Sequence, residues 1–179
     1  MLPHPSRAPR SSWAALTAVL LVTSVSRAQE TTESGNGIPT LHPLGLNSVV
    51  KMAVIEAHRR LGDSGCQQIF SDFEDASGQT LKAKLEAIGQ TGQSYLGWIW
   101  FVDGGYRGRC AQDEVVAFTS PGSQVVRFCG DRFTRAISRQ GLGFLATMVI
   151  HEELHSLGLG EDPPSSTEIT RRVEFRCGS

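Results

Sequence analysis

The stretch MVIHEELHSLGLGED, residues 148–162, decides how the rest of this chain is interpreted. It closes a segment whose apolar residues recur at helical spacing: Leu142, Leu145, Val149 and Leu154. Phe144, Met148 and Ile150 make the other faces apolar as well, which is typical of a buried helix. The sequence therefore predicts a buried helix over 142–158, with polar residues concentrated near its end.

Two histidines in this stretch predict a metal site. His151 and His155 are one helical turn apart, so their imidazoles project from the same face and can reach one ion. Zn²⁺ suits them because it accepts neutral imidazole and, in catalytic sites, binds three protein ligands and a water. Glu152 lies where its carboxylate would flank that water, which predicts a general base. The alternative is a helix end with two capping histidines and a solvated glutamate.

A third metal ligand is expected from the residues that follow this helix. Gly158 can adopt the left-handed conformation that ends a helix and reverses the chain. The returning chain would carry Glu161 back toward the histidines, so we expect Glu161 to be the third ligand. Asp162 and Glu168 are the alternatives, although Ser165 and Glu168 are also spaced as a helix capping box.

The pattern His151-Glu152-x-x-His155-x-x-Gly158-x-x-Glu161 resembles the extended zinc signature of the metzincin metallopeptidases, with glutamate where those enzymes have histidine or aspartate. Upstream, AFTSP at 117–121 and VRFCGDRF at 126–133 are similar to the strand pair and Cys-x-x-Phe-like segment of the deuterolysin-like aspzincins. Together these resemblances imply a zincin-like fold and zinc-dependent peptide hydrolysis. No methionine follows Met148 to form a Met-turn, and no Gly-Thr segment carries an aspzincin aspartate. The expectation is therefore the zincin class, and neither family.

These features predict a zinc metallopeptidase that acts on a peptide or protein substrate. Zn²⁺ would be held by His151, His155 and a carboxylate, and Glu152 would move the proton of the attacking water. The strand expected at Val125–Phe128 would offer its backbone to an extended substrate, as edge strands do. The alternative function is a binding or structural domain in which zinc only stabilises the fold. A structural site, however, usually has four protein ligands and has no need of Glu152.

The first 28 residues have the pattern of a secretory signal peptide. Arginines precede an uncharged apolar run at 13–25, and small residues follow at the positions that signal peptidase recognises. The run is too short to span a bilayer comfortably, so we expect cleavage after Ala28 and export as a secreted or periplasmic protein. Residues 29–46 have the composition of a flexible leader, and one zincin-like domain is expected over 47–179.

The net charge of the chain limits the classes of binding partner that we expect. The first 28 residues hold three of the 17 Lys and Arg residues and none of the 18 Asp and Glu residues, so the exported chain has a net charge of about −4. Basic residues do not cluster, which argues against a nucleic-acid partner. No second apolar run is long enough to cross a membrane, so we expect no membrane association after signal cleavage.

The four cysteines are far apart and form no Cys-x-x-Cys pair, which argues against a zinc ribbon or a thioredoxin-like site. In an oxidising compartment their even number predicts two disulfides. We pair Cys110 with Cys129, because a hairpin expected between them brings Cys129 toward the residues before Val115. Cys66 then pairs with Cys177 and would tie the C-terminus to the domain.

Three other segments have helical spacing, at 49–61, 81–88 and 165–176. They complete a set of helices on both sides of a strand-forming region in the middle of the chain.

In that region, residues 95–102 are apolar on both faces, which predicts a central strand ended by the Asp103-Gly104-Gly105 turn. Apolar runs at 115–118 and 125–128 flank a Ser-Pro-Gly turn and predict a hairpin. Helices, then strands, then helices predict an α+β domain, here with a small twisted sheet and a buried zinc-binding helix.

Overall fold

The structure is a computed structural model that describes residues 47–178 of the chain. The expected signal peptide at 1–28 and the expected leader at 29–46 lie outside the described residues, as does residue 179. The fold that follows is that of the domain expected to begin at residue 47.

Helices make up most of the described chain. The α-helices are α1 (Ser48–Leu61), α2 (Ser64–Gln67), α3 (Leu81–Ala87), α4 (Gly92–Tyr95), α5 (Gly130–Ser156) and α6 (Ser166–Cys177), and the 3₁₀ turns are η1 (Gln68–Ser71), η2 (Leu96–Trp98) and η3 (Gly108–Ala111). Helices α1, α3 and α6 confirm the three helices predicted from spacing, with α3 ending one residue early.

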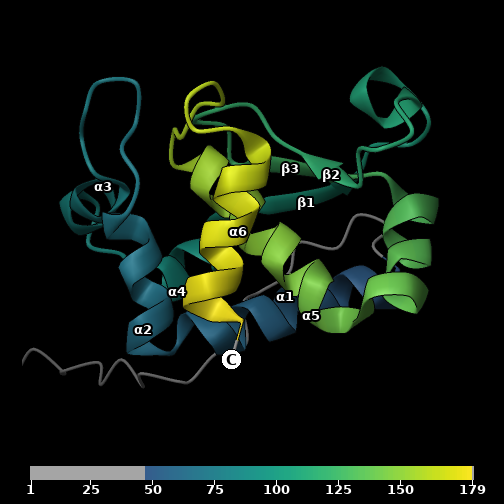
Figure 1. Ribbon diagram of the computed structural model, residues 1–179, viewed down its shortest axis with the longest axis horizontal. Coiled ribbons are helices and arrows are strands. Elements are labelled where there is room, and N and C mark those ends of the chain that lie inside the picture. Colours follow the sequence, from purple (N-terminus) through teal and green to yellow (C-terminus); the bar gives the residue numbers. More distant parts are fainter. Residues whose placement is uncertain (1–46, 179) are drawn as a thin grey trace, which may run out of the picture. The chain divides into compact units, whose positions relative to one another are not determined.

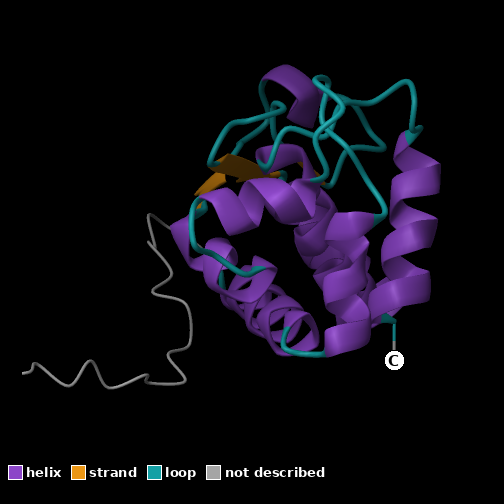
Figure 2. Cartoon of the chain, turned by 90° about the vertical axis from the view of Figure 1, so that its left-hand side faces the viewer, coloured by secondary structure: helices purple, strands orange, loops and turns teal. Residues whose placement is uncertain are grey.

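A three-stranded sheet accompanies these helices (Figure 1). Its strands β1 (Trp100–Asp103), β2 (Ala117–Phe118) and β3 (Val125–Phe128) lie in the order β1-β3-β2. Strand β3 is parallel to β1 and antiparallel to β2, which confirms the predicted hairpin. Helices combined with this small mixed sheet confirm the α+β class, and Figure 2 shows the connecting loops gathered on the same side as the sheet.

The position of β3 contradicts one expectation. Because β3 pairs with β1 on one side and with β2 on the other, its backbone groups are used within the sheet. Val125–Phe128 is therefore not an edge strand that could receive a substrate. The edges of the sheet are β1 and β2.

The prediction of a central strand over 95–102 is also wrong in two ways. Its first half is helical, and its second half is a strand at the edge of the sheet. The side chain of Thr91 accepts a hydrogen bond from the backbone of Ser94, and this capping box starts α4, which η2 continues to Trp98. Extended structure begins only afterwards, in β1, and β1 is an edge strand. The apolar run therefore reflects burial in a helical turn followed by an alternating strand, in which Phe101 is buried and Trp100 is exposed.

Helix α5 carries the opening stretch and is longer than predicted. Its second half agrees with the buried helix expected over 142–158, and the residues from Val149 to Leu157 are all buried. Its first half was not predicted, because only Phe133 and Ala136 there are buried and the remaining residues are mostly polar. Gly141, with φ 81° and ψ 172°, bends the chain between the two halves.

The core lies where α1 and α6 pack against α5 (Figure 1). Two disulfides brace it, and both confirm the predicted pairings. Cys66–Cys177 ties α2 to the end of α6, and Cys110–Cys129 ties η3 to the residue that precedes α5. Two disulfides fit an oxidising compartment.

Candidate metal centre

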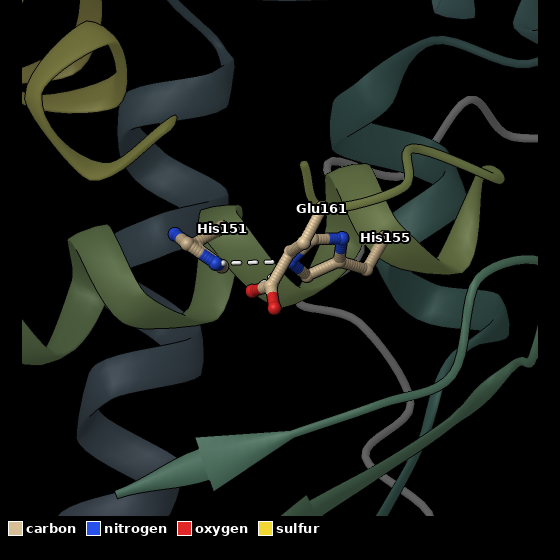
Figure 3. Close-up of side chains that lie close together, drawn as sticks. All are labelled: His151, His155 and Glu161. Atoms are coloured by element: carbon tan, nitrogen blue, oxygen red, sulfur yellow. Dashed lines mark hydrogen bonds and ion pairs between the residues drawn. The ribbon is translucent and has the colours of Figure 1, made fainter. Parts of the chain in front are cut away.

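The last turns of α5 bring two imidazoles together edge to face, with an angle of 68° between the ring planes. His151 and His155 are buried, and their Nε2 atoms lie 3.0 Å apart. Figure 3 shows them on successive turns of the helix, with the carboxylate of Glu161 reaching toward them from the segment that follows. Their four-residue spacing on a regular helix is what brings the two nitrogens together.

A Schellman turn ends α5 and reverses the chain. The N–H of Gly158 donates to the carbonyl of His155 at 2.8 Å, and the N–H of Leu159 donates to the carbonyl of Leu154 at 3.1 Å. Gly158 has φ 109°, a conformation that favours glycine. Leu154 and Leu159 are both buried, so the turn is fixed by apolar packing as well as by hydrogen bonds.

This turn brings Glu161 to the histidines. Its Oε1 lies 3.3 Å from Nε2 of His155, and one donor atom from each of His151, His155 and Glu161 lies within 4.8 Å of the others. Neither Asp162 nor Glu168 belongs to this group. Glu168 is exposed, and its backbone N–H is instead hydrogen-bonded to the side chain of Ser165, the N-cap of α6.

The distances and protonation states fit a small divalent cation. Two Zn–N bonds of about 2.0–2.1 Å at a tetrahedral angle would place the nitrogens about 3.3 Å apart, close to the spacing of the two Nε2 atoms. Burial, followed by repulsion from His155, lowers the pKa of His151 to about 3. That imidazole is therefore neutral at pH 7, as metal binding requires. The three residues could hold a metal ion.

The other nitrogen of each ring is held in place. Nδ1 of His155 lies 2.8 Å from the carbonyl oxygen of Leu159, which only accepts, so this nitrogen carries the proton and Nε2 presents a lone pair. Nδ1 of His151 lies 3.0 Å from the hydroxyl of Thr170 on α6. Such partners orient the ligands of metal sites and raise their basicity. Sequence reasoning missed Thr170, because its contact crosses between two helices.

The side chain of Glu152 lines the same cleft as these three residues. Burial is the main cause that raises the pKa of its carboxyl to about 8; Arg109 opposes this rise, nearby Glu161 adds to it, and a hydrogen bond from the backbone N–H of Thr119 opposes it. Oε2 of Glu152 is buried and has no hydrogen-bond partner among the described residues. An unpaired buried oxygen is costly, so this atom is suited to a water or substrate group held beside the metal.

The hairpin forms one wall of a cleft over these residues. The N–H of Gly122 donates to the carbonyl of His155 at 2.9 Å, which fixes the hairpin loop against the end of α5. The cleft has a volume of about 470 Å³, and residues 115–119 line it together with His151, Glu152, His155 and Glu161. Arg109, on η3, also lines it. No sequence signal apart from its neighbour Cys110 singled Arg109 out.

Glu153 differs sharply from its neighbour Glu152. It is completely buried and does not line the cleft, and neither of its carboxylate oxygens has a hydrogen-bond partner in the described part of the chain. Burial raises the pKa of this carboxyl well above its ordinary value, because the charged form is disfavoured away from water. It belongs to the interior behind the site.

Among residues 47–178, no helix is long and apolar enough to cross a membrane. Comparison of the chain with protein-family models, with curated proteins and with solved structures finds no match.

Proposed function

We propose that this protein is an exported zinc-dependent metallopeptidase with a zincin-like fold. One observation carries the proposal: two imidazole nitrogens and the Glu161 carboxylate converge on one point of a cleft, and the unpaired carboxylate oxygen of Glu152 lies in the same cleft. Two imidazoles and one carboxylate leave a coordination position open for water, which is the ligand set of catalytic rather than structural zinc sites.

Zinc bound here would supply a bound water of lowered pKa and would polarise the scissile carbonyl. The residues of the chain do the rest. His151, His155 and Glu161 orient the reacting groups, and Glu152 accepts a proton from the attacking water. Glu152 then delivers that proton to the nitrogen of the leaving amine as the C–N bond breaks. Burial of Glu152 favours its protonated form, and a cation held beside it would favour the carboxylate form that accepts the proton.

Strand β2 is the better candidate for contacting an extended substrate. It is an edge strand, and it lines the cleft, whereas β3 is enclosed by its two neighbours. A peptide lying along Ala117–Phe118 would run past Thr119, whose backbone is bound to Glu152. In this arrangement Thr119, the residue directly after β2, connects the sheet edge to the general base.

Export is the part of the proposal that rests on the sequence. The signal-like pattern at 1–28 lies outside the described residues, and the two disulfides support an oxidising destination.

The proposal is tested by assaying one preparation for bound zinc and for cleavage of a mixed peptide library, beside Glu152→Gln. We expect about one equivalent of zinc in both proteins. Cleavage should fall by roughly 10²- to 10⁴-fold in the variant, because the general base is lost and the metal ligands remain. Glu168→Gln, the same change at an exposed site on α6, is the matched control and should cleave as the wild type does.

The outcomes separate the candidate functions. Zinc bound without cleavage by the wild type would favour a non-catalytic domain that zinc stabilises. The absence of zinc binding would contradict both functions, and equal cleavage by wild type and Glu152→Gln would remove Glu152 from the mechanism.

A further inference from the structure

Arg109 stands at the mouth of the metal cleft on a braced segment. It belongs to η3, and its neighbour Cys110 is bonded to Cys129, the residue before α5. Its guanidinium carbon lies 5.8 Å from the ring centroid of Phe118, on the edge strand β2. The disulfide on one side and the cation–π contact on the other hold the arginine over the cleft.

The guanidinium group has hydrogen-bonding capacity that the protein does not use. Nη2 of Arg109 lies 3.9 Å from Oε2 of Glu161, which is an ion pair but is too long for a hydrogen bond. The side chain is 51% exposed. None of its five N–H groups donates a hydrogen bond to another of the described residues, so the guanidinium can donate hydrogen bonds to a ligand in the cleft that it lines.

Metal binding would strengthen the anion preference of this position. Glu161 is the nearest acidic partner of Arg109, and a cation held by Glu161 would neutralise much of its charge. Arg109 would then face the cleft beside a cationic centre. The planar fork of arginine matches a carboxylate in a bidentate geometry, which makes carboxylates its preferred ligands in such sites.

We propose that Arg109 is a specificity-determining residue that binds a carboxylate of the substrate close to the scissile bond. This inference rests on the proposed peptidase function and names its substrate class: peptides that carry an acidic side chain, or a free C-terminal carboxylate, within reach of the arginine. The two sources present the same chemical group to the guanidinium, and experiment distinguishes them.

The test uses the zinc-saturated protein and three pools of mixed-sequence peptides that are otherwise identical. The first pool has an amidated C-terminus and carries one glutamine, placed at each position in turn. The second pool differs only in having glutamate in place of that glutamine. The third keeps the glutamine but has a free C-terminal carboxylate. We expect kcat/KM for one or both of the carboxylate pools to exceed that of the neutral pool by about tenfold or more. The second pool reports a side-chain carboxylate and the third a terminal one.

Variants then assign the preference to Arg109. In Arg109→Gln the ratio of carboxylate to neutral pools should fall close to one, and in Arg109→Glu it should fall below one because like charges repel. Arg107→Gln is the matched control, since Arg107 is exposed on the same segment and does not line the cleft. A ratio that stays unchanged in Arg109→Gln, or a variant that slows all three pools equally, would overturn the proposal.

A second measurement keeps this inference separate from the proposed function. Fluorescein-labelled peptides from the same pools are titrated with zinc-loaded Glu152→Gln, and binding is followed by fluorescence anisotropy. If the wild type cleaves no peptide, the peptidase proposal fails, but tighter binding of carboxylate pools that disappears in Glu152→Gln/Arg109→Gln would still support the subsite. Equal binding of all pools would overturn it.

Discussion

The two histidines of the metal centre share one helix face but are held by different parts of the molecule. Leu159, four residues further along the same turn, accepts the hydrogen bond of the His155 ring. Thr170, on helix α6, holds the ring of His151. One half of the site is therefore built by local structure at the end of α5, and the other half depends on how a separate helix packs.

Helix α6 is fixed by contacts far away in the sequence. Cys177 is bonded to Cys66, and the guanidinium of Arg176 makes two 2.8 Å hydrogen bonds to Asp72. The local half, by contrast, is formed mainly by the Schellman turn and its glycine. The orientation of the His155 ring and of Glu161 therefore depends mainly on the helix end, whereas that of the His151 ring depends on the packing of α6.

The largest effect is expected from removing the ligand that the local half supplies. Glu161→Ala should lower zinc affinity by more than about 100-fold, because loss of a direct ligand exceeds the 10- to 100-fold cost of losing an outer partner. Competition with a chelator of known affinity measures the change. Glu168→Ala, which alters α6 instead, should leave the affinity close to that of the wild type. Equal losses in the two variants would contradict the assignment of Glu161 as the third ligand.

Gly158→Ala should have the next largest effect. A Cβ at this position would lie 2.8 Å from Nζ of Lys84, and φ 109° is strained for alanine. We expect a loss of about 1–3 kcal/mol in the free energy of unfolding, measured by urea denaturation of the metal-free protein. Zinc affinity should fall as well, because the same turn carries Leu159 and Glu161.

Gly160→Ala is the matched control for that turn. A Cβ there would meet nothing within 4 Å, and its φ does not lie in the range that disfavours side chains. Wild-type zinc affinity in Gly158→Ala would show that the turn does not position the ligand.

Thr170→Val probes the distant half of the site. The change keeps the shape of the side chain but removes the hydroxyl that holds Nδ1 of His151. Zinc affinity should fall about tenfold, the lower end of the range for outer partners, since one hydrogen bond is lost and the ring stays enclosed by the helix packing. Thr167→Val is the control, because Thr167 is an exposed residue of α6 that lines the cleft but, among the described residues, makes no hydrogen bond to a histidine. An unchanged zinc affinity in Thr170→Val would mean that the hydrogen bond from α6 does not contribute to metal binding.

The same division explains what the sequence could predict. The histidine spacing, the stop at Gly158 and the return of the chain to Glu161 are all local consequences of helix geometry, and the structure brings these three side chains together. The hairpin followed from a short-range pattern as well; it predicted the Cys110–Cys129 disulfide, and Cys66–Cys177 was the pair that remained. Such features depend on a few consecutive residues, whose conformational preferences are readable one at a time.

What the sequence could not predict depends on tertiary packing. Thr170 and Arg109 approach the site from other elements, and nothing in their own neighbourhoods marks them. Residues 95–98 are apolar enough for a strand, yet the cap formed by Thr91 makes them helical. The place of β3 between two partners, which removed it as a substrate edge, follows from a parallel pairing with β1 that no local pattern encodes.

The smallest effect is expected from the ion pair that packs against the turn at Gly158. Lys84 makes a 2.8 Å ion pair with Asp75, and both side chains lie against Gly158. Lys84 is the main cause that holds the pKa of Asp75 well below its ordinary value of 3.8, and the hydroxyl of Ser77 adds to this. A lowered pKa means that the unfolded chain binds more protons than the folded one, so the stabilisation is complete above pH 3.8 and is lost as the pH falls further.

Asp75→Asn should therefore flatten the decline in unfolding free energy below pH 4, measured by urea denaturation at successive pH values. Glu74→Gln, an exposed change in the same loop, should not, and identical profiles for Asp75→Asn and wild type would mean that the turn at Gly158 holds without its ion pair.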